Sequence, residues 1–244
     1  MSDKKSELNI LWLWPDILCQ HGDRGNVMAL VRMCALYGIE ARVTRVNRLT
    51  DGFDLKDTDI ALLGPGELAV MPRIIGALSG EKITTWANDG GVLLATGTTG
   101  AAIGVQTRRL DGSYIYGAGL VDIECRERET VLGDDLIYRA TGDMDIYGIQ
   151  IHMIDIDLSG DQKPFGETVY GYGNNGTKTE GAIRDNVIFT NALGPVLVKN
   201  PWLTLDMINR ALGTSHKFDP GLFALELESA EIIKKFNNNK EKPK

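Results

Sequence analysis

Residues 92–100 read Val92-Leu93-Leu94-Ala95-Thr96-Gly97-Thr98-Thr99-Gly100, an apolar run that ends abruptly in a turn of glycine and threonine. A continuous apolar run is typical of a strand that is buried on both faces of a parallel sheet. The glycines permit a tight turn after this strand, and a helix is expected to open there. Ligands of open parallel sheets bind beyond the carboxyl ends of the strands, so this turn is a candidate site.

Strands and helices are predicted to alternate on the amino-terminal side of this run. We expect strands at Leu8–Trp14, Glu40–Val46, Asp59–Leu63 and Val92–Thr96, with helices at Asn26–Tyr37 and Pro72–Asp89. Because parallel strands need crossover connections, this order favours a mostly parallel sheet with helices on both faces. The strand at Asp59–Leu63 ends at Gly64-Pro65-Gly66, which makes a second candidate turn at the same edge of the sheet.

The carboxyl-terminal half has a different pattern. Short strands are expected within Gly112–Arg126, Ala140–Asp157, Gly166–Gly173 and Gly181–Thr190, and a last helix at Pro201–Leu212. Turn signals between these strands favour antiparallel additions to the sheet. No repeat or Pro/Ser-rich linker divides the chain, so one domain is expected. The polar end from Phe236 onward predicts disorder.

Composition excludes several classes of function. The chain has 244 residues and a formal net charge of −7, so it lacks the basic character that nucleic acids or anionic membranes select. No apolar stretch approaches the roughly 20 residues that span a bilayer. The first seven residues carry no signal-peptide pattern, so a cytoplasmic protein is expected. Three widely spaced cysteines, Cys19, Cys34 and Cys125, form neither a disulfide framework nor a zinc pattern, and no cofactor or metal is expected.

A series of segments is similar to one enzyme family. The segments are Leu13–Leu18, Gly22–Leu30, Gly64–Gly66, Tyr170–Asn175 with Glu180-Gly181, and Gly194–Leu197 with Lys199–Pro201. In this order and spacing they resemble the CobB/CobQ-like class I glutamine amidotransferases, most of all the GatD-type glutaminase subunit of lipid II isoglutaminyl synthase. The resemblance implies a three-layer, flavodoxin-like domain over residues 8–215. An extension over 216–235 and a disordered tail over 236–244 would follow it.

The resemblance implies thiol catalysis, in which a cysteine on a strand–helix turn attacks the side-chain amide of glutamine. A histidine moves the protons, and backbone N–H groups hold the oxyanion. In this sequence Thr96 stands at the place of the cysteine and Leu193 at the place of the histidine. A threonine hydroxyl is a poor nucleophile without a strong base, and leucine carries no proton. The family's pocket is then expected to be lined by Gly64, Pro65, Gly66, Thr96, Gly97, Thr98 and Leu193.

Relocated chemistry is a second hypothesis. His152 lies in a segment that resembles one near the family's active-site face, and Cys125 is the cysteine that could pair with it. A buried structural histidine is the commoner role for such a residue. Asp23 or Asn26, at the start of the first helix, is expected to cap it.

The preferred hypothesis is a catalytically degenerate amidotransferase-like subunit. The resemblance implies a Mur-ligase-like, ATP-dependent partner that acts on a cell-wall precursor or a related carboxylate. Arg24, Trp14 and Trp202 are candidate anchors for that partner, because Arg and Trp dominate stable interfaces. The alternatives are an active glutaminase that uses relocated residues, and a sensor of a glutamine-like small molecule.

Overall fold

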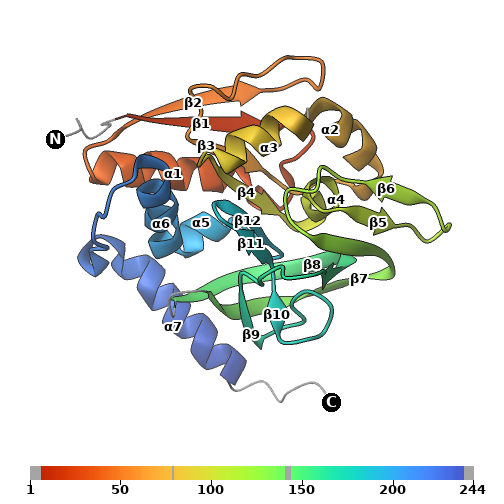
Figure 1. Ribbon diagram of the computed structural model, residues 1–244. Helices are drawn as coiled ribbons and strands as arrows, with labels where there is room; N and C mark the ends of the chain where they lie inside the picture. The colour runs from red at the N-terminus through yellow and green to blue at the C-terminus, as the bar shows by residue number, and fades with distance from the viewer. Residues whose placement is uncertain (1–6, 79, 141–143, 239–244) are drawn as a thin grey trace.

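The computed structural model describes residues 7–78, 80–140 and 144–238 (Figure 1). Its central sheet has six strands in the order β11-β12-β4-β3-β1-β2. All neighbours in this sheet are parallel except β11 and β12, which are antiparallel. The strands are β1 (Glu7–Leu13), β2 (Glu40–Val46), β3 (Ile60–Leu63), β4 (Val92–Thr96), β11 (Ala182–Arg184) and β12 (Val187–Thr190).

Helices cover both faces of this sheet. One face carries α1 (Arg24–Leu36), α5 (Val196–Lys199) and α6 (Pro201–Leu212), and the other carries α2 (Met71–Leu78), α3 (Gly80–Asn88) and α4 (Gly100–Ile103). Side chains of a strand point alternately to its two faces. Ile10 and Trp12 of β1 therefore join the core under α1 and α6, whereas Leu11 and Leu13 join the core under α2 and α3. The predicted three-layer arrangement is confirmed.

A second sheet holds most of the antiparallel additions. It contains β5 (Gln106–Arg108), β6 (Tyr114–Tyr116), β7 (Ile123–Ala140), β8 (Met144–Leu158), β9 (Gly166–Tyr170) and β10 (Thr179–Glu180). The 18-residue β7 pairs with β8 along almost its whole length. No strand was expected over residues 127–139, because charged side chains interrupt the apolar pattern there. Several of these side chains are exposed or half-buried on β7, which leaves the strand too polar to recognise.

Two predicted boundaries need correction. The single helix expected at Pro72–Asp89 is two helices, α2 and α3, and α3 begins at Gly80, where the low helix propensity of glycine favours a break. The segment predicted to be an extension and a tail contains α7 (Ala224–Asn238), preceded by the short turn η4 (Pro220–Phe223). Residues 236–238 are thus helical, while 239–244 lie outside the described residues. Across the part of the chain described, no helix has the length and apolar character to cross a membrane.

Candidate functional site

Three turns meet at the carboxyl edge of the central sheet. They follow β3, β4 and β12, which are neighbours in the sheet, and they contain Gly64–Gly66, Gly97 and Leu193. The register places Leu63 beside Ala95 and Thr190 beside Thr96, so the three strands end at nearly the same level. Every residue expected to line the pocket is therefore brought together, and all of them are buried.

Gly97 occupies the apex of the turn after β4. Thr96 has the extended backbone of a strand residue, with φ −130° and ψ 140°. Gly97 has φ 61°, a left-handed conformation that glycine adopts readily and other residues only under strain. A Cβ atom at position 97 would lie 3.2 Å from Leu193 Cδ2 and 3.2 Å from Pro65 Cβ. The position that faces Leu193 across the site is thus Gly97.

Thr98 closes the turn against the glycine-rich strand end. The Thr98 hydroxyl donates to the Gly66 carbonyl oxygen at 2.5 Å and accepts from the Gly66 N–H at 3.0 Å. Pro65 has no N–H to offer. The Gly66 N–H, which stands where the resemblance places an oxyanion donor, is therefore already bonded within the protein. Nothing in the sequence pattern marked this contact across 32 positions.

Asp23 is a buried carboxyl group next to these turns. It is 5% exposed and lies against Gly64, where a Cβ atom would collide with its Oδ2. Burial raises the pKa of Asp23 to about 6, although a hydrogen bond donated by the Asn26 side chain to Oδ1 at 2.8 Å opposes the shift. No side-chain cap bond forms at the start of α1, so the predicted capping role of Asp23 is wrong. Asn26 instead accepts from the Leu197 N–H at 2.9 Å.

Replacing Asp23 with asparagine should make the protein's stability less sensitive to pH. Because the folded pKa lies above the ordinary value of 3.8, folding takes up a proton, and stability falls as the pH rises through about 6. Asp23→Asn has no ionisable group at this position, so its stability does not fall for this reason as the pH rises. Its stability relative to the wild type should grow by about 1.4 kcal/mol between pH 5 and pH 8. Urea unfolding at several pH values measures the difference. A constant difference would contradict the assignment.

A buried polar network holds the segment that carries Leu193. The Glu180 carboxylate is fully buried, and it accepts hydrogen bonds from Thr190 Oγ1 at 2.8 Å, Asn191 N–H at 2.8 Å and Asn191 Nδ2 at 3.0 Å. Burial raises the pKa of Glu180, which the three donors counteract. The Asn174 side chain accepts from the Gly181 N–H and from Asn191 Nδ2, and it donates to the Gly181 carbonyl oxygen. Hydrogen bonds from Asn174 and Glu180 therefore hold the segment Thr190-Asn191, which leads to Leu193.

The relocated pair Cys125 and His152 does not form. Cys125 pairs with Ile156 across the β7–β8 ladder, so His152 is four residues, or roughly 13 Å, further along β8. The thiol is buried, and burial raises the pKa of Cys125 to about 12. His152 is 2% exposed, with Nε2 3.1 Å from Gln150 Oε1, and burial lowers its pKa. The two side chains cannot act as a nucleophile and its base, so the predicted Cys125–His152 pair is wrong.

The three candidate partner anchors differ in accessibility. Trp14 is fully buried and makes an edge contact with Phe53 in the core, so it cannot anchor a partner, and that prediction is wrong. Trp202 is half-buried between Tyr147 and Phe218. Arg24 is exposed at the start of α1, where the adjacent Gly25 lies against Pro195. Of the three, Arg24 alone is exposed beside the site.

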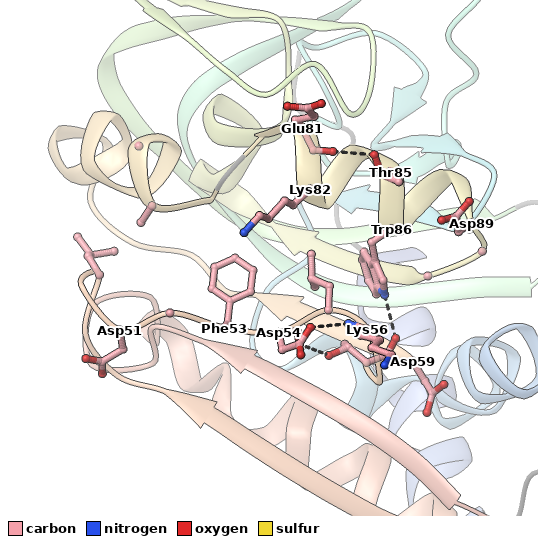
Figure 2. Close-up of a pocket in the computed structure, with 18 of the residues that line it drawn as sticks. Asp51, Phe53, Asp54, Lys56, Asp59, Glu81, Lys82, Thr85, Trp86 and Asp89 are labelled. Carbon is pink, nitrogen blue, oxygen red and sulfur yellow. Dashed lines mark hydrogen bonds between the residues drawn. The ribbon is translucent and has the colours of Figure 1, made fainter.

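A cavity of about 1150 Å³ lies at the opposite edge of the sheet, between α3 and residues 49–59. Figure 2 shows Phe53, Lys82 and Trp86 projecting toward this space, with Trp86 Nε1 donating to the Thr58 carbonyl oxygen at 2.8 Å. Its lining includes Asp59 and Gly91, the residues that precede β3 and β4. The cavity is therefore separate from the site around Gly97.

Comparison with known proteins is consistent with this architecture. No family model matches the chain. It is 31% identical over 242 residues to the lipid II isoglutaminyl synthase (glutamine-hydrolyzing) subunit GatD of Streptococcus pneumoniae, covering 97% of this chain and 93% of the relative. It is 27% identical over 211 residues to the GatD subunit of Staphylococcus aureus, covering 84% of each.

Solved structures show the same fold at low identity. A glutamine amidotransferase crystal structure has a TM-score of 0.57 at 13% identity, covering 82% of this chain and 98% of that one. The glutaminase domain of Trypanosoma brucei CTPS, with bound acivicin, has a TM-score of 0.51 at 9% identity, covering 87% and 96%. The predicted amidotransferase-like fold is thus confirmed. Given this fold and the identity that extends along 97% of its length, the chain belongs to the GatD family of glutamine amidotransferase-like proteins.

Proposed function

We propose that this chain is a GatD-family subunit that does not hydrolyse glutamine and acts through its surface on an ATP-dependent, Mur-ligase-like partner. The relatives are named as glutamine-hydrolysing subunits of lipid II isoglutaminyl synthase. The partner's reaction would then be amidation of a cell-wall precursor or a related carboxylate. Free ammonia or another amine would supply the nitrogen. Residues 8–215 would form the amidotransferase-like domain, and the remainder an extension.

The main observation behind the proposed loss of glutamine hydrolysis is that Gly97 and Leu193 face each other. Thiol catalysis needs a nucleophile at the apex of the strand–helix turn and a base within hydrogen-bond reach. Gly97 holds the apex and has no side chain, so we revise the place of the nucleophile from Thr96 to Gly97. Leu193 faces it with an isobutyl group. Neither position can attack an amide or accept a proton.

The oxyanion donors supply a second argument. An oxyanion hole works because preorganised N–H groups point at the place where negative charge develops. Here the Gly66 N–H donates to Thr98 Oγ1 instead. The nucleophile, the base and one oxyanion donor are therefore altered together.

The partnership can be tested by co-purification with the ligase from the native host. We expect a stable complex, and we expect Arg24→Ala to weaken it at least tenfold, or about 1.4 kcal/mol, because arginine anchors are frequent hot spots. Arg73→Ala is the matched control, since Arg73 is an exposed arginine on α2. It should change the affinity less than twofold. If the ligase does not co-purify and is fully active without this chain, the proposed partnership is wrong.

A further inference from the structure

Helix α7 exposes three large apolar side chains along one side, and we call this row, with Leu222, the stripe. Leu225 is 78% exposed, Ile232 60% and Phe236 59%, and Leu222 extends the stripe at 42%. A different side of the helix packs on the protein through Ala230 and the half-buried Ile233. Figure 1 shows α7 along the outside of the molecule. Contiguous apolar side chains on a surface mark an interaction site more often than scattered ones do.

The stripe has the spacing of a coiled-coil seam. Leu225, Ser229, Ile232 and Phe236 follow one another at intervals of four, three and four residues. This is the d–a–d–a order of two heptads, in which alternate positions meet a partner helix. The small polar Ser229 sits at one of these positions. The helix has 15 residues, or roughly 22 Å, enough for four layers of contact.

The charges beside the stripe favour a second copy of the same helix in the antiparallel direction. Glu228 and Lys235 are both exposed, and each stands one residue before an a position, which is the g position of its heptad. In an antiparallel pair with Leu225 opposite Phe236 of the other copy, each g position faces the other g position. Glu228 then faces Lys235 of the second copy, and the two-fold axis repeats the pair. A parallel pair would place Glu228 opposite Ile233 instead.

We propose that α7 mediates an antiparallel, two-fold symmetric homodimer of this chain, a role independent of glutamine chemistry. A two-fold interface must be complementary to itself, and acidic Glu228 with basic Lys235 on one apolar stripe meets that condition. The interface is short, so the dimer should be weak and reversible, with a dissociation constant on the order of 10–100 µM.

Sedimentation of the full-length protein over a wide concentration range tests the proposal. We expect a monomer–dimer equilibrium whose dissociation constant rises at least tenfold in Ile232→Glu. Glu228→Lys and Lys235→Glu should each weaken the dimer, because each creates two like-charge pairs. An equimolar mixture of these two variants should associate again. In that heterodimer the two substituted side chains carry opposite charges and face each other, while the native pair of Glu228 and Lys235 re-forms on the other side.

Glu231→Lys is the matched control, because Glu231 is an exposed glutamate of α7 outside the stripe. It should leave the dissociation constant within twofold of the wild type. Circular dichroism of every variant should show unchanged helix content, which separates loss of the dimer from loss of the fold. A chain that stays monomeric at about 500 µM would overturn the proposal. So would a dimer that Ile232→Glu leaves intact, or a stripe whose substitution removes only the association with the ligase.

Discussion

Purified protein incubated with glutamine is expected to release no ammonia above a blank, with or without the ligase. Removing the nucleophile and the base together costs an amide hydrolase roughly 10⁴- to 10⁶-fold in rate. In the proposed assignment Gly97 and Leu193 stand at the two positions, and the Gly66 N–H donates to Thr98 Oγ1. Robust hydrolysis by the unaltered protein that Cys125→Ala abolishes would refute the proposed loss of activity.

Variants that reintroduce a cysteine and a histidine test whether position 97 or position 96 corresponds to the catalytic cysteine of the family. The triple variant Gly97→Cys, Thr98→Gly, Leu193→His supplies a thiol at the apex, frees the Gly66 N–H and adds a base. We expect measurable hydrolysis, about tenfold above the blank or more. The matched control replaces Gly97→Cys with Thr96→Cys in the same background, and it should remain at the blank. Hydrolysis by the control variant alone would show that position 96, and not position 97, corresponds to the catalytic cysteine.

Alkylation gives a second readout that does not depend on turnover. A thiol next to a protonated imidazole has a lowered pKa and reacts with iodoacetamide at lower pH. The variant that carries both Gly97→Cys and Leu193→His should therefore react at lower pH than Gly97→Cys alone. Equal pH profiles would show that positions 97 and 193 do not face each other.

Glu180→Ala is expected to destabilise the protein by about 3 kcal/mol. The substitution leaves the buried Asn191 N–H without an acceptor, at roughly 1–3 kcal/mol for an unsatisfied group. It also removes one of the partners of Thr190 Oγ1 and of Asn191 Nδ2, which keep Tyr138 Oη and Asn174 Oδ1. Relief of the buried charge offsets part of this cost, because burial already raises the pKa of Glu180. The melting temperature should fall by about 6–12 °C, which calorimetry measures.

Two variants control for the Glu180 substitution. Glu180→Gln keeps one oxygen acceptor at the same place, so its melting temperature should lie between those of the wild type and Glu180→Ala. Glu81→Ala removes an exposed glutamate from α3 and should shift the melting temperature by less than about 2 °C. A melting temperature of Glu180→Ala equal to that of the wild type would show that the network does not brace the segment.

The amino-terminal half was predictable because its signals are local. The apolar run at Val92–Thr96 and the alternation at Glu40–Val46 give the observed bounds of β4 and β2. The long β7 was not predictable, since it carries charged residues where one side of the second sheet meets solvent. Helix α7 was not predicted either, because its sequence lacks a clear amphipathic period. Its apolar residues divide between a packed side and an exposed stripe, which blurs a single amphipathic period.

The site was predictable as a set of turns but not in its details. Glycine-rich strand ends located two of the turns, and the family resemblance located the third at Leu193. The structure brings all three together. The sequence could not show that φ is positive at Gly97, because glycine adopts φ of either sign with similar ease. The contact between Thr98 and Gly66 and the burial of Asp23 depend on tertiary packing. The burial of Trp14 also depends on tertiary packing. Its residue type suggested a partner anchor, but it lies in the hydrophobic core against Phe53.

The order of strands in the central sheet also affects how the chain can be synthesised. β4 lies between β3 and β12, but residues 97–186 separate β4 from β12 in the sequence. At ribosomal speeds this interval lasts on the order of 5–20 s. During that time β1 to β4 can assemble while the other edge of β4, an apolar strand, still has free backbone N–H and C=O groups. Such an edge recruits other strands, so nascent chains should depend on chaperones until β12 emerges and completes the ladder.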